Sequence, residues 1–349
     1  MSWFCGRSHL MVKENGGPMS DVIRPCLRRM GMSNLVARLL LTGLMVMFAP
    51  FNGSGEGSGP AEASPLDHVA FGVYDPHGSF AGAREPAIEH IFVFWQALDL
   101  RDFRHRLDQA RASGRIMMVT VEPFTRAPNW RDGGDQLFQE ILRGGYRDEI
   151  STICGTLGDF GGRVLVRWGH EMEKPTGRYP WARRDARGYQ AAFRHFVDQC
   201  RRMAPETRYV WSPVGERNMG AYYPGPAHVD FVGVSLWGLQ SYDERFHRGV
   251  RDFPASFREK YDRAARFGKP VIIAELGVSG DRNYRENWLR SLFETLARSE
   301  SFRALRAVVY FNDKEPHYWP FGLGSPDWRV TPDQWRAVQA SALQRLAAR

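Results

Sequence analysis

The stretch RWGHEMEKPTGRYPW, residues 167–181, combines groups capable of acid–base chemistry with flat aromatic rings. Arg167, His170 and Glu171 close an apolar run, and Tyr179 and Trp181 follow soon after. A glutamate beside a histidine can donate or accept a proton, and ionisable groups gather in this way more often at functional sites than in packed cores. We therefore interpret this stretch as one wall of a candidate catalytic site.

Two more glutamates lie near the ends of apolar runs that are distant in the sequence. Glu275 follows PVIIA, and Glu122 follows RIMMVTV. Cleavage of a glycosidic bond needs one protonated carboxyl group for the leaving oxygen and one ionised carboxylate on the opposite side of the sugar. Two glutamates on separate strand ends can supply both groups.

Aromatic residues close several other apolar runs. Pyranose rings present apolar C–H faces that stack on flat aromatic side chains, while their hydroxyl groups need polar partners around the rim. A single tryptophan or glutamate at such a position is as often structural as functional, so it is their coincidence that favours a sugar site. The aromatic candidates at run ends are Trp95, Trp211, Trp237 and Phe311.

Short apolar runs recur along the chain after residue 67, with amphipathic stretches between them. Most are continuously apolar, which is typical of parallel strands buried on both faces. The stretches between them repeat apolar residues at spacings of three and four, which predicts helices. The runs cover residues 68–74, 90–96, 115–123, 163–171, 208–213, 230–237, 270–277 and 306–313.

Eight strands, most of them followed by a helix, predict a single-domain (β/α)8 barrel over residues 64–349, a TIM barrel of the α/β class. The active site of such a barrel lies at the carboxyl ends of the strands, where the candidate residues fall. A doubly wound sheet is the alternative. It would more often carry a Gly-rich phosphate turn after the first strand, and YDPHGSFAGARE lacks the required spacing.

Residues 1–63 differ in composition from the rest and predict an export signal with a flexible linker. LVARLLLTGLMVMFA has the length of a secretory apolar region, and GSGEGSG reads as the linker. AEA at 61–63 has the form of a cleavage site, and Met30 or Met32 could serve as a later start. We expect a secreted or periplasmic protein. An uncleaved segment would instead anchor it to a membrane, and a buried core helix is the remaining alternative.

The net charge of +8 comes from interleaved positive and negative residues, as in RDFRHRLDQARASGR, and not from a clustered basic face. Binding of nucleic acid is therefore not predicted. A polysaccharide is the expected partner, the protein is expected to be a monomer, and the chemistry requires no metal or organic cofactor. Cys154 and Cys200 match no zinc-binding spacing, so a disulfide and two buried thiols both remain open.

The same stretch resembles the Arg-x-x-His-Glu-Met motif of glycoside hydrolase family 26, a family of endo-β-mannanases and β-1,3-1,4-glucanases. PVIIAELG resembles the strand that carries the nucleophile in that family. GGYRDEI, VWSP, VDFVGVS and a late DW follow in the expected order, so the resemblance covers roughly residues 68–345.

This resemblance implies a retaining mechanism on a (β/α)8 barrel, with Glu171 as the acid/base and Glu275 as the nucleophile. His170 would border the subsite of the cleaved sugar. Arg167 would orient a carboxylate through two parallel hydrogen bonds, and it would help to keep Glu275 ionised. The substrate-binding candidates are His170, Arg167, Trp95, Glu122, Tyr179, Trp181, Trp211, Trp237 and Phe311, and Glu122 is the reserve catalytic candidate.

Several positions depart from the family pattern. Glu173, Lys174 and Pro175 stand where Asn-Gly and an aromatic residue are frequent, and Trp237 stands where many relatives have a tyrosine. The substrate therefore remains open between β-1,4-mannan and mixed-linkage β-glucan. A hydrolase that processes a polysaccharide made by the same cell, or a non-catalytic glycan-binding protein on this fold, are the alternatives.

Overall fold

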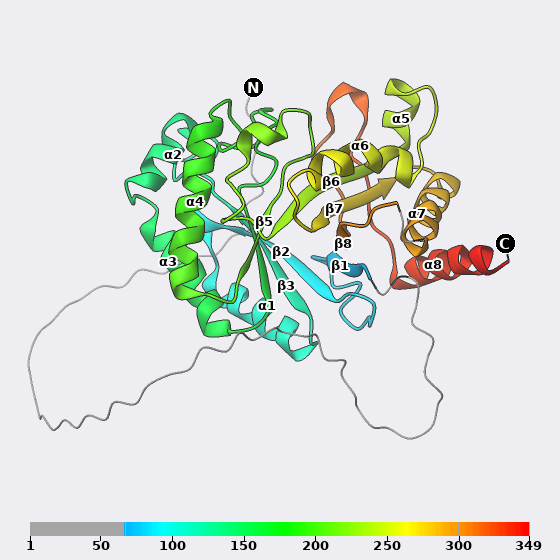
Figure 1. Ribbon diagram of the computed structural model, residues 1–349, viewed down its shortest axis with the longest axis horizontal. Coiled ribbons are helices and arrows are strands. Elements are labelled where there is room, and N and C mark those ends of the chain that lie inside the picture. Colours follow the sequence, from blue (N-terminus) through cyan, green and yellow to red (C-terminus); the bar gives the residue numbers. More distant parts are fainter. Residues whose placement is uncertain (1–65, 67, 299–300, 349) are drawn as a thin grey trace, which may run out of the picture. The chain divides into compact units, whose positions relative to one another are not determined.

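The computed structural model describes residues 66, 68–298 and 301–348. In this part of the chain, eight parallel strands each pair with the next, and β8 pairs with β1 to close a barrel (Figure 1). This confirms the predicted (β/α)8 architecture. The strands are β1 (Ala70–Tyr74), β2 (Ile88–Phe94), β3 (Ile116–Glu122), β4 (Val164–Trp168), β5 (Arg208–Trp211), β6 (Phe231–Leu239), β7 (Val271–Ser279) and β8 (Leu305–Phe311).

Helices form the outer layer of the barrel. Aspartate or threonine side chains accept backbone N–H groups at the first turns of five of them, which satisfies donors that a helix start leaves free. The helices are α1 (Leu100–Ala112), α2 (Gly134–Leu142), α3 (Arg147–Phe160), α4 (Ala186–Met203), α5 (Gln240–Phe246), α6 (Phe253–Ala265), α7 (Arg282–Ala297) and α8 (Pro332–Ala347). β1 continues into β2 through residues 75–87 without a helix.

Alternate residues of each strand face the barrel interior. The lower interior is apolar and contains Ile88, Met118, Leu165, Val210, Ile272, Ala274, Ala307 and Val309. Above this layer the inward positions become polar, with His90 on β2, Thr120 on β3 and Arg167 on β4, all of them buried. The change from apolar floor to polar mouth follows the strands toward their carboxyl ends, where barrel active sites lie.

An irregularity in β7 changes which residues face inward. Ala274 belongs to the interior layer, whereas Leu276 packs with the outer core, and the register to both neighbouring strands shifts in this region. A bulge of this kind re-aims the side chains that follow it. It allows Glu275 to face the mouth directly after Ala274.

The predicted export signal and linker, and the predicted boundary between residues 63 and 64, lie outside the described residues. They remain predictions. Within the residues that the structure describes, none of the helices combines the length and apolarity needed to cross a bilayer.

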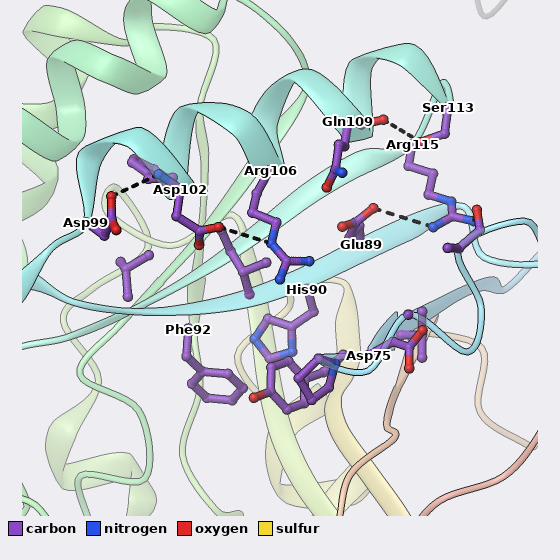
Figure 2. A pocket seen from close by; sticks show the side chains of 18 of the residues that line it. Asp75, Glu89, His90, Phe92, Asp99, Asp102, Arg106, Gln109, Ser113 and Arg115 are labelled. Carbon is purple, nitrogen blue, oxygen red and sulfur yellow. Dashed lines mark hydrogen bonds and ion pairs between the residues drawn. The ribbon is translucent and has the colours of Figure 1, made fainter. Parts of the chain in front are cut away.

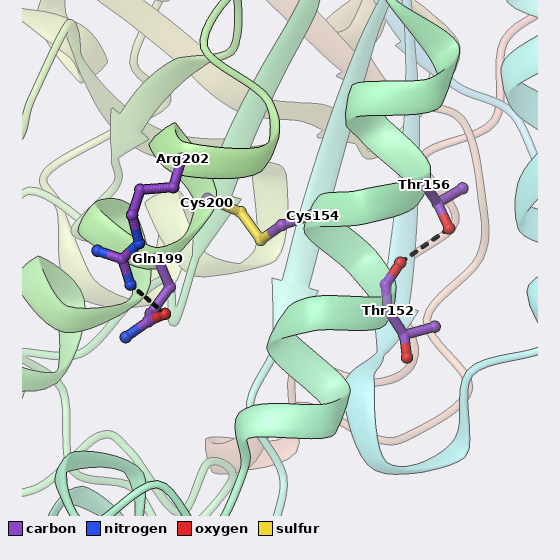
Figure 3. Close-up of a disulfide and its surroundings, with 6 residues drawn as sticks. All are labelled: Thr152, Cys154, Thr156, Gln199, Cys200 and Arg202. Carbon is purple, nitrogen blue, oxygen red and sulfur yellow. Dashed lines mark hydrogen bonds between the residues drawn. A yellow bond between two sulfur atoms is a disulfide. The ribbon is translucent and has the colours of Figure 1, made fainter. Parts of the chain in front are cut away.

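A disulfide joins Cys154 of α3 to Cys200 of α4 (Figure 3). Their Cα atoms are 5.0 Å apart, within the roughly 4.4–6.8 Å range of disulfides. Both residues are fully buried between the two helices that flank β4. The sequence left a disulfide and two buried thiols open, and the structure has the disulfide.

Loss of this disulfide should destabilise the barrel. The bond closes a loop spanning 46 positions, and cross-links of this kind contribute about 2–4 kcal/mol by restricting the unfolded chain. We expect the Cys154→Ala/Cys200→Ala variant to unfold at lower urea concentration than the parent protein. Equal midpoints for the oxidised parent and the variant would contradict the bond, and added dithiothreitol should shift only the parent.

Candidate active site

Glu171 lies in the loop directly after β4 and has a left-handed backbone with φ of 55°. This conformation costs a non-glycine residue of the order of 1 kcal/mol or more, so neighbouring contacts must hold it. Its backbone N–H donates to the carbonyl oxygen of Ser212 at 2.9 Å. Its Oε1 accepts a hydrogen bond from Oγ of Ser235 at 2.7 Å. Ser212, directly after β5, and Ser235 of β6 thus position the half-buried Glu171.

Glu275 lies next to the same serine, because Ser235 and Glu275 are register partners on β6 and β7. Glu275 is buried, and its Oε1 is 2.6 Å from Nη1 of Arg167. Ser235 therefore has one glutamate at its hydroxyl group and the other on the adjacent strand. The structure brings the two predicted catalytic residues together from strands that are distant in the sequence.

Arg167 holds Glu275 differently from the expectation. The guanidinium is fully buried, yet a single nitrogen contacts the carboxylate, and the same Nη1 also donates to Oγ1 of Thr120 at 3.3 Å. Nε and Nη2 have no hydrogen-bond partner in the described part of the chain. The predicted pair of parallel hydrogen bonds is therefore wrong, because only Nη1 contacts the Glu275 carboxylate.

His170 is buried between the carboxylates and the aromatic wall. Its Nε2 lies 4.0 Å from Oε1 of both Glu122 and Glu275, and 3.1 Å from the hydroxyl oxygen of Tyr179. Burial, together with the nearby Arg167, holds the pKa of His170 well below its usual value. The imidazole is therefore neutral at pH 7, and it can exchange hydrogen bonds with a ligand without adding charge.

Burial dominates the electrostatics of the other two carboxyl groups that face inward. It raises the pKa of Glu275 to about 7, against the lowering effect of Arg167. It raises the pKa of Glu122 to about 8, against the lowering effect of Arg178. Arg167 lowers the pKa of Glu275, as expected, but removal of the carboxyl group from water outweighs this one ion pair.

Half-buried aromatic rings surround the mouth. Trp237 and Phe311 lie there as predicted, with ring centroids 5.7 Å apart. The structure adds two rings that sequence reasoning missed. Tyr74 lies 4.8 Å from Phe311, and Phe92 lies 5.9 Å from the ring of His170. Both were visible as residues at or near run ends, HVAFGVY and HIFVFWQ, so position alone could have identified them.

Trp95 and Trp211 do not line the mouth, which corrects the prediction. β2 ends at Phe94, and Trp95 begins a 3-10 turn in which it stacks on Tyr146 and donates to the Phe124 carbonyl oxygen. Trp211 is fully buried in the outer core, with its ring 5.1 Å from the rings of Tyr223 and Phe267. Because both faces of a parallel strand are apolar, the sequence does not reveal which of two neighbouring residues points inward.

Tyr179 and Trp181 are also buried, so they support the site from behind instead of lining an open cleft. Their rings stack with centroids 4.6 Å apart. Nε1 of Trp181 donates to the carbonyl oxygen of His170 at 2.6 Å. The two aromatic residues of the opening motif therefore fix the position of His170, the residue before Glu171.

A set of contacts absent from the sequence prediction anchors the Glu171 loop. The buried carboxylate of Glu173 accepts the N–H groups of Gly215 and Glu216 at 2.9 and 3.2 Å. The half-buried Lys260, whose pKa desolvation lowers to about 8, donates to the carbonyl oxygens of Val214 and Ser235. Glu173, which departs from the family motif, thus ties the loop after β4 to the loop after β5.

A cavity of about 780 Å³ lies between β1, β2 and α1 (Figure 2). Neither Glu171 nor Glu275 lines it. It borders the mouth through Tyr74, Phe92 and Phe94, and it runs along the polar face of α1. The connection between β1 and β2 contains no helix, and its residues 75, 76, 78 and 81 line the cavity opposite α1.

Comparison with known proteins finds relatives whose names are those of polysaccharide-degrading enzymes. No family model matches the sequence. Endoglucanase H of Acetivibrio thermocellus is 25% identical over 252 residues, which cover 68% of this chain and 26% of the relative. Beta-1,3-xylanase TXYA of Vibrio sp is 29% identical over 109 residues, which cover 29% of this chain and 23% of the relative. The match thus spans about a quarter of the length of these curated relatives.

Solved structures share the barrel. A modular endo-β-1,4-mannanase of Cellulomonas fimi, from glycoside hydrolase family 26, has a TM-score of 0.58 at 15% identity, covering 82% of this chain and 71% of the mannanase. GH26C of Muricauda sp. has a TM-score of 0.52 at 16% identity, covering 71% and 80%. These structures agree with the resemblance to family 26. At sequence identities of 15% and 16%, they show a shared fold and nothing more.

Glu122→Gln should change how stability depends on pH. A carboxyl group whose pKa is raised on folding stays protonated in the native state while the unfolded chain ionises, so native stability falls as pH rises from about 4.5 to about 8. The variant lacks this loss. We expect its unfolding free energy relative to the parent to rise by roughly 1–4 kcal/mol between pH 5 and pH 8, measured by urea unfolding.

The exposed Glu206, in the turn before β5, supplies the matched control. Glu206→Gln should track the parent protein at both pH values. If the difference in unfolding free energy between Glu122→Gln and the parent stays constant between pH 5 and pH 8, Glu122 is not buried and protonated in the native state.

Proposed function

We propose that this chain is a retaining endo-β-glycosidase acting on a β-linked polysaccharide. The observation that carries the proposal is that Glu171 and Glu275 flank one residue, Ser235, at the mouth of a (β/α)8 barrel. Glycoside hydrolases with this chemistry need two carboxyl groups on opposite sides of one sugar. The half-buried rings of Trp237 and Phe311 beside them suit the apolar faces of pyranose units.

In the proposed mechanism, the carboxylate of Glu275 attacks the anomeric carbon while Glu171 gives its proton to the leaving glycosidic oxygen. The bond from carbon to the leaving oxygen breaks, and a covalent glycosyl-enzyme forms. Glu171 then takes a proton from water, and the resulting hydroxide displaces Glu275. Arg167 and His170 border Glu275 and keep it oriented throughout.

β-1,4-Mannan and mixed-linkage β-glucan are the first substrates to test. The mannanase of Cellulomonas fimi shares the fold, and the sequence relatives include an endoglucanase and a β-1,3-xylanase. The altered residues around Glu173 and Trp237 change the walls of the site relative to family 26, so release of reducing ends from β-1,3-xylan belongs in the same assay. Binding without release would favour a non-catalytic glycan-binding protein.

Export is part of the proposal. An extracellular polysaccharide requires an exported enzyme, and the apolar segment within residues 1–63 has the character of a secretory signal. The buried disulfide between Cys154 and Cys200 suits an oxidising compartment. A polysaccharide made by the same cell would be an accessible substrate there.

Glu275→Ala should abolish hydrolysis, because it removes the carboxylate that acts as the covalent nucleophile in the proposed mechanism. We expect activity on the responsive polysaccharide to fall by at least about 10³-fold. Azide should restore part of it and give a glycosyl azide of inverted configuration. Glu171→Ala should lose about 10²–10⁴-fold on polysaccharides, and less on substrates whose leaving group needs no protonation. Full activity in Glu275→Ala would exclude it as the nucleophile, and Glu206→Ala is the surface control.

The pH dependence of kcat/KM should have an acid limb near neutral pH. Glu275 must be ionised to attack, and its burial raises its pKa to about 7, so activity should fall as pH drops below that value. Initial rates on the responsive polysaccharide between pH 4 and pH 9 test this. An acid limb near the ordinary glutamate value of about 4.5 would show that Glu275 is not desolvated in the active enzyme.

A further inference from the structure

Two large apolar side chains are exposed side by side at one edge of the barrel mouth. Phe94 is the last residue of β2, and Trp130 lies in the loop between β3 and α2; they are 40% and 41% exposed. Their ring centroids are 5.5 Å apart. Phe124 backs both rings, at 5.7 and 6.1 Å. We call this pair the Phe94–Trp130 platform. Adjacent exposed rings of this size often mark a binding surface.

The loop that carries Trp130 is built to hold the ring in place. The backbone N–H of Thr125 donates to the carbonyl oxygen of Trp130 at 3.0 Å. The hydroxyl group of Thr125 donates to the carbonyl oxygen of Asp132 at 2.6 Å. The side-chain amide of Asn129 donates to Oδ1 of Asp132 at 3.0 Å. A ring that is exposed and yet pre-positioned loses little conformational entropy when it binds a ligand.

The platform is continuous with the candidate active site. Phe94 is the register partner of Glu122 on β3, and Glu122 lies 4.0 Å from His170. Phe124, behind the platform, packs on Trp181 at 5.0 Å, and Trp181 holds the His170 backbone. Phe94 also lines the cavity beside β2, whose labelled lining includes Phe92 (Figure 2). The platform thus extends the β2–β3 side of the mouth outward.

We propose that the Phe94–Trp130 platform is a distal subsite that stacks a pyranose unit of the polysaccharide, away from the bond that is cleaved. The inference rests on the proposed function, and it names the place where the polysaccharide leaves the catalytic mouth. A sugar fits this surface because two adjoining rings offer an apolar face, while Asn129, Arg131 and Asp132 in the same loop offer polar groups for hydroxyls.

Trp130→Ala and Phe94→Ala test the platform by substrate length. We expect KM for the polysaccharide to rise about tenfold in each variant with kcat nearly unchanged, because a distal contact binds ground state and transition state alike. Rates on short aryl glycosides, which do not reach the platform, should stay at the parent level. Leu142→Ala is the matched control, because Leu142 is 44% exposed at the end of α2. Equal losses on long and short substrates, or no loss on either, would overturn the proposal.

Affinity electrophoresis separates this inference from the proposed hydrolysis. Gels containing glucomannan, barley β-glucan or β-1,3-xylan should retard the parent protein and Leu142→Ala, and they should retard Trp130→Ala and Phe94→Ala much less. That result supports the platform even if no reducing ends are released. Equal retardation of all four proteins, or retardation of none, overturns it. A dimeric parent with monomeric platform variants in size-exclusion chromatography would assign the surface to self-association instead.

Discussion

Closure of eight parallel strands into one ring is the constraint on which the site depends. Closure requires every strand to end on the same rim, so residues that are far apart in the chain meet there. Glu171 follows β4 and Glu275 lies in β7, yet Glu171 accepts a hydrogen bond from Ser235 of β6, and Glu275 is the register partner of the same serine. The bulge in β7 turns Glu275 toward the mouth. In a regular strand, Leu276 would be the next inward residue after Ala274.

Desolvation controls the charges inside this rim. Arg167, His90 and Thr120 form a buried polar layer directly beneath the mouth, and Arg167 supplies a single ion pair to Glu275. One ion pair lowers the carboxyl pKa less than burial raises it, so the site keeps a carboxyl group near its titration point at neutral pH. A neutral His170 between two carboxyl groups avoids a second buried charge.

The loop after β4 shows how a strained residue is maintained. Glu171 adopts a left-handed backbone, and contacts from two other segments offset its cost. The segment after β5 contributes Ser212 at the backbone and binds the loop through Glu173, and β6 contributes Ser235 at the carboxylate. Lys260 completes the arrangement by holding the carbonyl oxygen of Ser235. The acid/base candidate is therefore positioned by contacts that lie outside its own motif.

Much of this architecture follows from the sequence by itself. The continuous apolar runs and the amphipathic stretches between them identify the barrel, and carboxylates near the run ends identify Glu171, Glu275 and Glu122 as its mouth residues, because burial pattern and strand polarity are local properties. Only the tertiary structure decided the orientation of Trp95 and Trp211 and the single ion pair of Arg167. It also decided the disulfide between Cys154 and Cys200 and the roles of Ser235, Glu173 and Lys260. Each of these depends on which distant segment lies opposite. In a strand with two apolar faces, nothing in the residue order records that information.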